Sequence, residues 1–153
     1  MRSNTEDREL RLRRTLNAPV SLVWEVWTNP EHIAKWWGPD GFTNTISTMD
    51  LVPGGSWHLV MHGPDGTDYP NKSKFIEVIE FKRISCEHFN PHIIATIDFE
   101  ADGARTHLDW HMLFDSAEDF QAVVKAHNAA EGLKQNVQKL QIYLTEQLIN
   151  NDI

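Results

Sequence analysis

The sequence has little of what secreted or membrane-spanning proteins use. It contains a single cysteine, Cys86, which excludes an internal disulfide and is typical of a reducing compartment. No stretch approaches the ~18 consecutive apolar residues that a membrane-crossing helix needs. No apolar run follows a basic start either, so we expect no signal peptide. These features predict a cytoplasmic protein with no membrane partner.

Basic residues are also scarce. The chain has 14 Lys and Arg against 22 Asp and Glu, a formal net charge of −8. Nucleic acids and anionic membrane surfaces are bound through dense clusters of Lys and Arg. The only such cluster lies between Arg8 and Arg14, and the acidic residues Glu6, Asp7 and Glu9 dilute it. We therefore predict that nucleic acid is not a partner.

Motifs for nucleotide binding and for nucleophilic catalysis are missing from the sequence. There is no phosphate-binding P-loop, no Gly-x-Ser-x-Gly elbow and no dinucleotide fingerprint. Cys86 has only His88 near it, on a predicted strand where a free thiol usually packs as a small apolar group. We therefore predict no catalytic residue and no cofactor.

The eight histidines are the remaining source of metal ligands. His58 and His62 share one face of a predicted strand, and His107 and His111 share one face of another. Four imidazoles could bind a metal if the two strands were neighbours in register. Because they alternate with apolar residues, we expect them to point away from the core, and we predict no metal site.

What the sequence does contain is an ordered series of local patterns. Leu10 and Leu12 alternate with charged residues and predict a first strand. Two short helices then begin at Pro19 and after Asn29, a residue that can cap a helix N-terminus. Period-two alternation broken by turn residues follows. It predicts strands over residues 42–51, 57–62, 72–80, 83–89, 93–100 and 105–114.

The chain is expected to close with a long helix. Ser116 can cap it, and the helical pattern runs from about Ala117 to Leu148, on the order of 30 residues and 45 Å. One strand, two short helices, a run of antiparallel strands and one long helix make an α+β architecture. We predict a single domain over residues 1–153, with its core between about 9 and 148.

Three stretches carry a resemblance to a known family. They are APVSLVWEVWTNPEHIAKWWGPDGF, MDLVPGGSWHLVMHGPDGTDYPN and HNAAEGLKQNVQKLQIYL. The chain resembles the bacterial relatives of the heat-shock chaperone ATPase activator, a group within the START-like, polyketide-cyclase-type superfamily, from about Glu9 to Leu148. The resemblance implies a helix-grip fold, in which a curved antiparallel sheet of about six or seven strands wraps around the C-terminal helix. The two short helices close one end.

The resemblance also implies a cavity between the sheet and the C-terminal helix. Many members of the superfamily use it for an apolar or aromatic ligand. This chain departs from the group at Leu133, where a tryptophan often follows the Glu-Gly pair, and in Glu80–Ser85, which lacks the usual double proline. The first departure is expected to enlarge or reshape the cavity beside the helix.

Inward-facing side chains on the strands are the candidate walls of this cavity. Alternation places Trp57, Leu59 and Met61 on one inner face, with matching faces at residues 93–99 and 106–112. Most buried aromatic side chains are plain core, so each is a candidate only. The candidate ligand contacts from the strands and their flanking turns are Phe42, Trp57, Leu59, Met61, Tyr69, Phe75, Phe99, Trp110 and Met112.

The adjacent tryptophans Trp36 and Trp37 end the second predicted helix. Neighbours on a helix are ~100° apart, so the two rings cannot face the same way. One is expected to pack between the short helices and the sheet, and the other to lie near the cavity mouth. The pattern does not decide which is which. We take Trp37 as the candidate ligand contact.

Polar residues interrupt the apolar stripe of the C-terminal helix. Val124 belongs to this stripe, and His127 and Glu131 fall on it one turn apart. A buried imidazole and carboxylate are costly unless they are hydrogen-bonded or lie beside water. One interpretation is a partly wet pocket in which both hold a ligand's polar group. The other is that the helix rolls and exposes both to solvent.

Three functions remain open at this point. The first is binding of a small hydrophobic or aromatic molecule. The second is an enzyme of the cyclase, dehydratase or hydrolase type, for which Glu77 would be an inward base if it shares a face with Phe75. The third is a co-chaperone-like module that binds a chaperone partner, which is an inference from fold alone. A homodimer through the open sheet face or the first strand is compatible with each.

Overall fold

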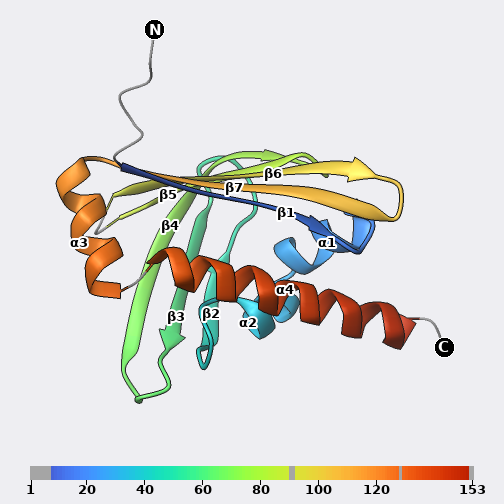
Figure 1. The fold of residues 1–153 in the computed structure, drawn as a ribbon, viewed down its shortest axis with the longest axis horizontal. Helices are drawn as coiled ribbons and strands as arrows, with labels where there is room; N and C mark the ends of the chain where they lie inside the picture. Colours follow the sequence, from blue (N-terminus) through green and yellow to red (C-terminus); the bar gives the residue numbers. More distant parts are fainter. Residues whose placement is uncertain (1–7, 90–91, 128, 152–153) are drawn as a thin grey trace, which may run out of the picture.

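The computed structural model describes residues 8–89, 92–127 and 129–151 (Figure 1). One strand, two short helices, a run of six strands and a helical C-terminal part follow one another in the described residues, the α+β order that the sequence predicts. In chain order the elements are β1 (Glu9–Leu16), α1 (Val20–Thr28), α2 (Pro30–Trp36), β2 (Thr43–Met49), β3 (Ser56–His62), β4 (Asp68–Ile79), β5 (Arg83–His88), β6 (Ile93–Asp102), β7 (Arg105–Phe114), α3 (Ala117–His127) and α4 (Ala129–Asn151).

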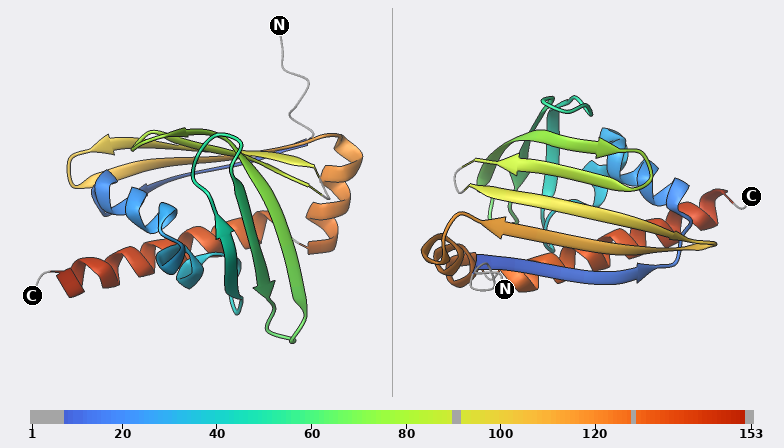
Figure 2. Two further views of the ribbon diagram at one scale, coloured as in Figure 1. Left: turned by 180° about the vertical axis from the view of Figure 1, so that it is seen from behind. Right: turned by 90° about the horizontal axis from the view of Figure 1, so that it is seen from above.

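The seven strands form one antiparallel sheet in the order β1-β7-β6-β5-β4-β3-β2. The sheet is strongly curved, so β2, β3 and β4 turn away from the β1-β7-β6 half and run down past α4 (Figure 1). The turned views in Figure 2 show α4 crossing the concave face, with α1 and α2 beside it near one end. This arrangement confirms the helix-grip fold.

The C-terminal helix is not continuous, and in this respect the prediction is wrong. Two helices replace it, α3 and α4, with Asn128 between them outside the described residues. The ring of Phe120 on α3 packs edge-on against Phe114 at the end of β7, with 5.3 Å between centroids. Leu140 and Leu144 on α4 are fully buried in the core beneath the sheet. Figure 1 shows that α3 and α4 run in different directions, so one straight helix does not describe this part of the chain.

Side-chain caps hold two helix starts where the sequence predicts them. The Asn29 Oδ1 accepts a hydrogen bond from the Glu31 backbone N–H at 3.0 Å, which satisfies an orphan donor of α2. The Ser116 Oγ accepts one from the Asp119 backbone N–H at 3.1 Å at the start of α3. Local sequence therefore fixes where these helices begin.

A bulge in β4 changes which face its later residues occupy. The register between β4 and β5 shifts between Phe75 and Glu77, so the two residues no longer share a face. Phe75 is buried in the core, whereas Glu77 forms an ion pair with Arg83 at 3.5 Å, with 45% of its side chain exposed. The prediction that Glu77 could face inward as a base is therefore wrong.

His92 fastens the start of β6 to two neighbouring segments. Its Nε2 lies 2.6 Å from the Glu87 carboxylate in β5, and its Nδ1 lies 2.6 Å from the Asp115 carboxylate after β7. These hydrogen bonds raise the pKa of His92 above its ordinary value, and the bond to Glu87 has the larger effect. The charged imidazolium is thus favoured in the folded state.

We expect the stability of the protein to fall as the pH rises above neutrality. A raised histidine pKa stabilises the fold fully below the unfolded-state value of 6.5, and that contribution is lost as the pH rises through the higher folded-state value. Urea unfolding of the wild type and of His92→Gln across this range tests it. In His92→Gln the free energy of unfolding should depend much less on pH than in the wild type. In His58→Gln, a substitution on the outer face of β3, it should depend on pH as in the wild type. Equal slopes in all three proteins would refute the assignment.

None of the helices within the described ranges is both long and apolar enough to cross a membrane.

Candidate functional site

A cavity of about 540 Å³ lies between the concave face of the sheet and α4. Volumes of ~300–1,000 Å³ are typical of small-molecule sites. Residues from the six strands β2 to β7 line it, together with Trp27 of α1, Ile33 of α2, the turn after α2, Val123 of α3 and part of α4. Its apolar walls include Ile84, Ile93, Ile97, Met49 and Leu133. This hollow lies on the side of the sheet where the family resemblance implies a cavity.

Most of the predicted contacts are brought together there. The cavity-lining residues that the sequence pattern singled out are Trp37, Phe42, Trp57, Met61, Tyr69, Phe75, Trp110 and Met112. The structure shows that these side chains lie around one space. That they bind a ligand stays a prediction. Alternation along the strands found Trp57, Met61, Phe75, Trp110 and Met112, whereas Trp37 came from the geometry of the helix before it.

Two predicted contacts lie in the core and not on the cavity wall. Phe99 is 5% exposed and packs edge-on against Trp24 and Trp27, at 5.4 Å and 5.7 Å between centroids. Leu59 is 4% exposed within the same core. Both face inward as predicted. They do not line the cavity, and for Phe99 the reason is that α1 covers this end of the sheet.

Of the polar pair considered on the C-terminal helix, the structure describes the side chain of Glu131 alone, and Glu131 does not line the cavity. Glu131 is exposed, because α4 turns Gly132, Leu133 and Asn136 toward the sheet in its place. The side chains of Val124 and His127 lie outside the described residues. The inward orientation of Glu131 is therefore a wrong prediction.

The two adjacent tryptophans divide their roles as expected. Trp36 is 1% exposed, and its Nε1–H donates to the Val26 carbonyl at 3.1 Å. Trp37 is half-buried, lines the cavity and stacks on Trp110, with 5.4 Å between centroids and 25° between planes. The core ring is thus Trp36, and the cavity ring is Trp37.

The turn after Trp37 is tied to α4. The Lys139 Nζ donates to the carbonyls of Gly38 and Pro39, each at 3.2 Å, and burial lowers the pKa of this ammonium. Gly38 has φ +95°, and a Cβ there would lie 2.9 Å from the Met61 methyl. Glycine at this position therefore lets the turn close over the cavity edge.

Polar residues missed by the sequence analysis interrupt the apolar wall. Asn71, Ser73 and His88 line the cavity from β4 and β5. The Asn71 Nδ2 donates to the Tyr69 carbonyl at 2.9 Å, and its Oδ1 lies 2.9 Å from the His88 Nε2. The oxygen is thus an acceptor, and His88 carries its proton on Nε2 in this bond. Alternation within β4 gave the signal, since residues 71, 73 and 75 share a face.

Unpartnered polar atoms also concentrate around this cavity. Six buried side-chain polar atoms of the described residues lack a hydrogen-bond partner. Four of them belong to cavity-lining residues: the Nε1 atoms of Trp27, Trp57 and Trp110, and the Oδ1 of Asn136. Native proteins leave few such groups unsatisfied, and each has an energetic cost.

Cys86 belongs to the cavity wall and has no nucleophilic character. Burial raises the pKa of its thiol to about 12. Since the thiolate is the reactive form, this cysteine packs as an apolar group.

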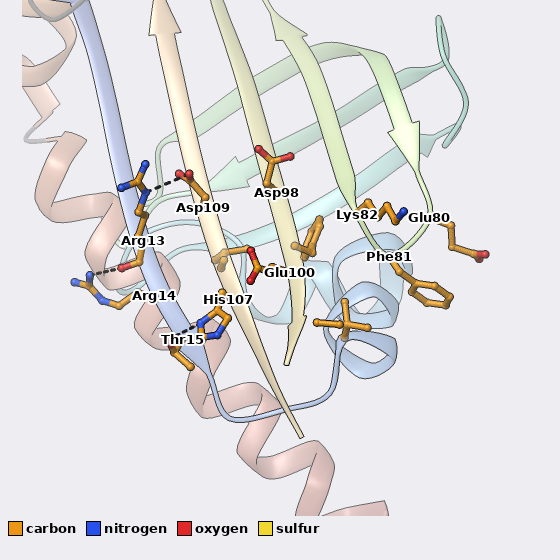
Figure 3. Close-up of a pocket in the computed structure, with 14 residues that line it drawn as sticks. Arg13, Arg14, Thr15, Glu80, Phe81, Lys82, Asp98, Glu100, His107 and Asp109 are labelled. Atoms are coloured by element: carbon orange, nitrogen blue, oxygen red, sulfur yellow. Dashed lines mark hydrogen bonds and ion pairs between the residues drawn. The ribbon is translucent and has the colours of Figure 1, made fainter. Parts of the chain in front are cut away.

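A second, larger hollow of about 1,000 Å³ lies at the ends of β1, β7 and β6, beside the β4–β5 turn (Figure 3). Charged side chains of both signs line it, and some of them form ion pairs. Arg13 contacts Asp109 at 3.3 Å, and Asp98 contacts Arg83 at 2.6 Å. Such exposed pairs contribute little free energy. The inner cavity is therefore the better candidate site.

The four histidines considered as metal ligands do not converge. β3, which carries His58 and His62, is separated by three strands from β7, which carries His107 and His111. His62 instead bridges the Thr45 hydroxyl at 2.8 Å and the Asp68 carboxylate at 2.7 Å, on the face opposite the cavity. Within the described ranges, no three His, Cys, Asp or Glu side chains are placed to hold a metal ion.

Solved structures from several bacteria share this fold. A protein from Nitrosomonas europaea is 25% identical, with a TM-score of 0.86 over 94% of this chain and 98% of its own. A protein from Mycobacterium smegmatis is 26% identical, with a TM-score of 0.84 over 95% and 96%. An AHSA1-like protein from Aeromonas hydrophila is 18% identical, with a TM-score of 0.69 over 87% and 93%, which shows the fold alone.

No curated protein matches the sequence significantly. The model of one family, described as Activator of Hsp90 ATPase homolog 1-like protein, matches residues 17–145. That range contains α1 to β7, α3 and most of α4, and hence every described residue of the cavity wall. The chain therefore belongs to the Activator of Hsp90 ATPase homolog 1-like family, in agreement with the resemblance seen in its sequence.

Proposed function

We propose that this protein binds a small hydrophobic or aromatic molecule in the cavity between the sheet and α4. The observation that carries the proposal is the cavity itself, about 540 Å³ in volume and walled by Trp37, Trp57, Phe75 and Trp110. Burying an aromatic ligand there removes apolar surface from water, at ~25 cal/mol per Å². Because the fold already holds the walls in place, little of that energy is spent on ordering the site.

Two substitutions on opposite walls test this proposal. Ala95 faces the cavity from β6, between Cys86 and Met112, and Gly132 faces it from α4. A Cβ at residue 132 would meet only Pro39 atoms, at 3.8 Å, so a larger side chain there can extend into the space. Ala95→Phe and Gly132→Leu should each fill part of the cavity. The matched control is Ala104→Phe in the exposed β6–β7 turn.

The probe is N-phenyl-naphthylamine, a neutral dye whose fluorescence rises in apolar surroundings. We expect saturable binding to the wild type and to Ala104→Phe. Ala95→Phe and Gly132→Leu should each weaken binding by about tenfold or more, equivalent to ~1.4 kcal/mol. Saturable binding that both filled variants retain would place the dye elsewhere and refute the proposal. Circular dichroism of each variant controls for folding.

An enzyme of the cyclase or hydrolase type is the second candidate, on one observation. The Ser73 hydroxyl and the His88 imidazole face the cavity from directly paired positions on β4 and β5. A nucleophile and its base act through a hydrogen bond between them. Here the His88 Nε2 donates its proton to the Asn71 Oδ1, so this nitrogen is not free to act as the base for Ser73. Binding without chemistry is therefore our first proposal.

The family name points to a chaperone partner, but the residues described above favour a small-molecule ligand. A cytoplasmic setting agrees with the proposal, since Cys86 is a buried free thiol.

A further inference from the structure

We infer that ligands enter the cavity between two turns of identical sequence, residues 38–41 and 63–66, and that Lys139 holds the first turn in place. This inference rests on the proposed function and specifies how its site is reached. Both turns read Gly-Pro-Asp-Gly. The first leads from α2 into β2, and the second joins β3 to β4. Gly38 and Pro39 of the first turn line the cavity, as does Met61 just before the second.

The exposure of the wall residues locates the mouth of the cavity. Two rings deep in the wall, Trp57 and Phe75, are 6% and 2% exposed. On the same wall Tyr69 is 41% exposed, Pro70 beside it is exposed, and Phe42 is half-buried. The wall is therefore nearest to solvent at the start of β4 and at the turn before β2.

The two turns meet at this mouth. A Cβ on Gly41 would lie 3.2 Å from the Pro64 Cβ, so the backbone of the first turn rests on the proline of the second. The rings that follow the turns, Phe42 and Tyr69, lie 5.9 Å apart between centroids. A Cβ on Gly63 would lie 3.2 Å from the Tyr69 Cε2, so this glycine leaves room for the ring. Turns and rings thus form the boundary between cavity and solvent at this point.

Polar contacts hold the first turn against α4. The Lys139 Nζ donates to the carbonyls of Gly38 and Pro39, each at 3.2 Å. One helical turn earlier, the Gln135 Oε1 accepts a hydrogen bond from the Asp40 backbone N–H at 3.1 Å. Such bonds contribute little net free energy, because water replaces them when the groups separate. The turn can therefore move away from α4 while the core stays folded.

A gate has a kinetic signature that a ligand contact lacks. Opening lowers the barrier for entry and for exit alike, so the association and dissociation rates rise together and Kd changes little. Loss of a ligand contact instead acts mostly on the dissociation rate and therefore on Kd. The two rates, measured separately, distinguish these roles.

A reversible disulfide across the two turns tests the inference most sharply. In the double variant Gly41→Cys with Pro64→Cys, the two Cβ atoms would lie 3.2 Å apart, near the ~3.5–4.5 Å that a disulfide spans. After oxidation with glutathione disulfide, it should bind and release N-phenyl-naphthylamine about tenfold or more slowly than when reduced, with Kd changed by less than about threefold. Stopped-flow fluorescence measures both rates. The control is Pro64→Cys alone, treated in the same way, and Cys86 is buried.

A second variant covers the case in which the double variant does not fold. Lys139→Met removes the ammonium that holds the first turn, and it should raise both rates by about threefold to tenfold with little change in Kd. Lys139→Arg keeps a charged donor and should restore most of the wild-type behaviour. The matched control is Lys134→Met, at an exposed position of α4. A loss of stability in Lys139→Met with both rates unchanged would contradict the role given to this lysine.

Equal exchange rates in the oxidised and reduced double variant would overturn the inference, because the dye would then enter elsewhere. Saturable binding that Ala95→Phe and Gly132→Leu weaken would leave the proposed function standing in that case. Failure of the wild type to bind the dye would instead refute the proposed function and this inference with it.

Discussion

Replacing Trp27 by alanine should lower the free energy of unfolding by about 3–5 kcal/mol, the largest loss expected for any single side chain here. Trp27 is 2% exposed and lies at the centre of the aromatic core. Its ring packs edge-on against Trp36 at 4.8 Å and against Trp110 at 5.1 Å between centroids. Its loss would leave a cavity at the junction of α1, α2 and the sheet. Such a cavity cannot collapse, because β7 and α2 hold its opposite sides.

The matched control for Trp27→Ala is Trp37→Ala. Trp37 belongs to the same cluster and lines the ligand cavity as Trp27 does, but it is only half-buried, whereas Trp27 is 2% exposed. Its removal should enlarge an existing cavity and cost clearly less stability than Trp27→Ala, while it weakens dye binding. Urea unfolding followed by circular dichroism measures both variants. Equal losses of stability would contradict the expectation that the more deeply buried ring contributes more to the free energy of unfolding.

Gly55→Ala is expected to cost about 3 kcal/mol or more, because the turn before β3 leaves no room for a side chain. A Cβ at residue 55 would lie 2.0 Å from the Asp50 carbonyl oxygen and 2.9 Å from that of Val52. Both oxygens belong to the backbone, so no side-chain rotation relieves the contact. This turn joins β2 to β3 and thereby positions Trp57 in the cavity wall.

Gly54→Ala separates this steric effect from conformational strain. Gly54 has φ +83°, and no atom lies within 4 Å of an added Cβ. Gly54→Ala should therefore lower the free energy of unfolding only by the cost of the left-handed backbone conformation, about 1–2 kcal/mol. In thermal and urea unfolding, Gly55→Ala should therefore be clearly less stable than Gly54→Ala. The reverse order would contradict the described geometry of this turn.

Local patterns in the sequence were sufficient to predict the elements of the fold. Period-two alternation found the strands, and Asn29 and Ser116 marked helix starts that the structure confirms with hydrogen bonds. The different directions of α3 and α4 (Figure 1) could not be predicted, because both halves of the helical pattern are compatible with one helix. Tertiary packing decides these directions, since Phe120 is held against Phe114 at the end of the sheet.

The candidate site was predicted well for its aromatic wall and poorly for its polar atoms. Strand alternation placed Trp57, Met61 and Trp110 correctly. The polar residue on the buried face of α4 was expected to be Glu131 but is Asn136, one turn from Leu133 and Leu140. The sequence pattern was treated as one apolar stripe on one helix, although the helix direction changes between α3 and α4. A helix that ends and restarts does not keep one apolar stripe.

The β4 bulge shows the same limit for strands. Up to Phe75 the side chains of β4 alternate regularly between the two faces of the sheet, and Ser73 and Phe75 are both buried. Beyond the bulge the faces exchange, and Glu77 pairs with Arg83 outside the sheet. A single extra residue thus converts a candidate inward base into a surface ion pair, and nothing in the local sequence marks its position.

The most direct test of the ligand site uses the methionine methyl groups. Met49, Met61 and Met112 are three of the four methionines in the chain, and all three line the cavity. In isotope-labelled protein titrated with methylnaphthalene, these three methyl resonances should shift with one common saturation curve and show nuclear Overhauser contacts to the probe. Saturable binding that leaves all three resonances unmoved would contradict the account.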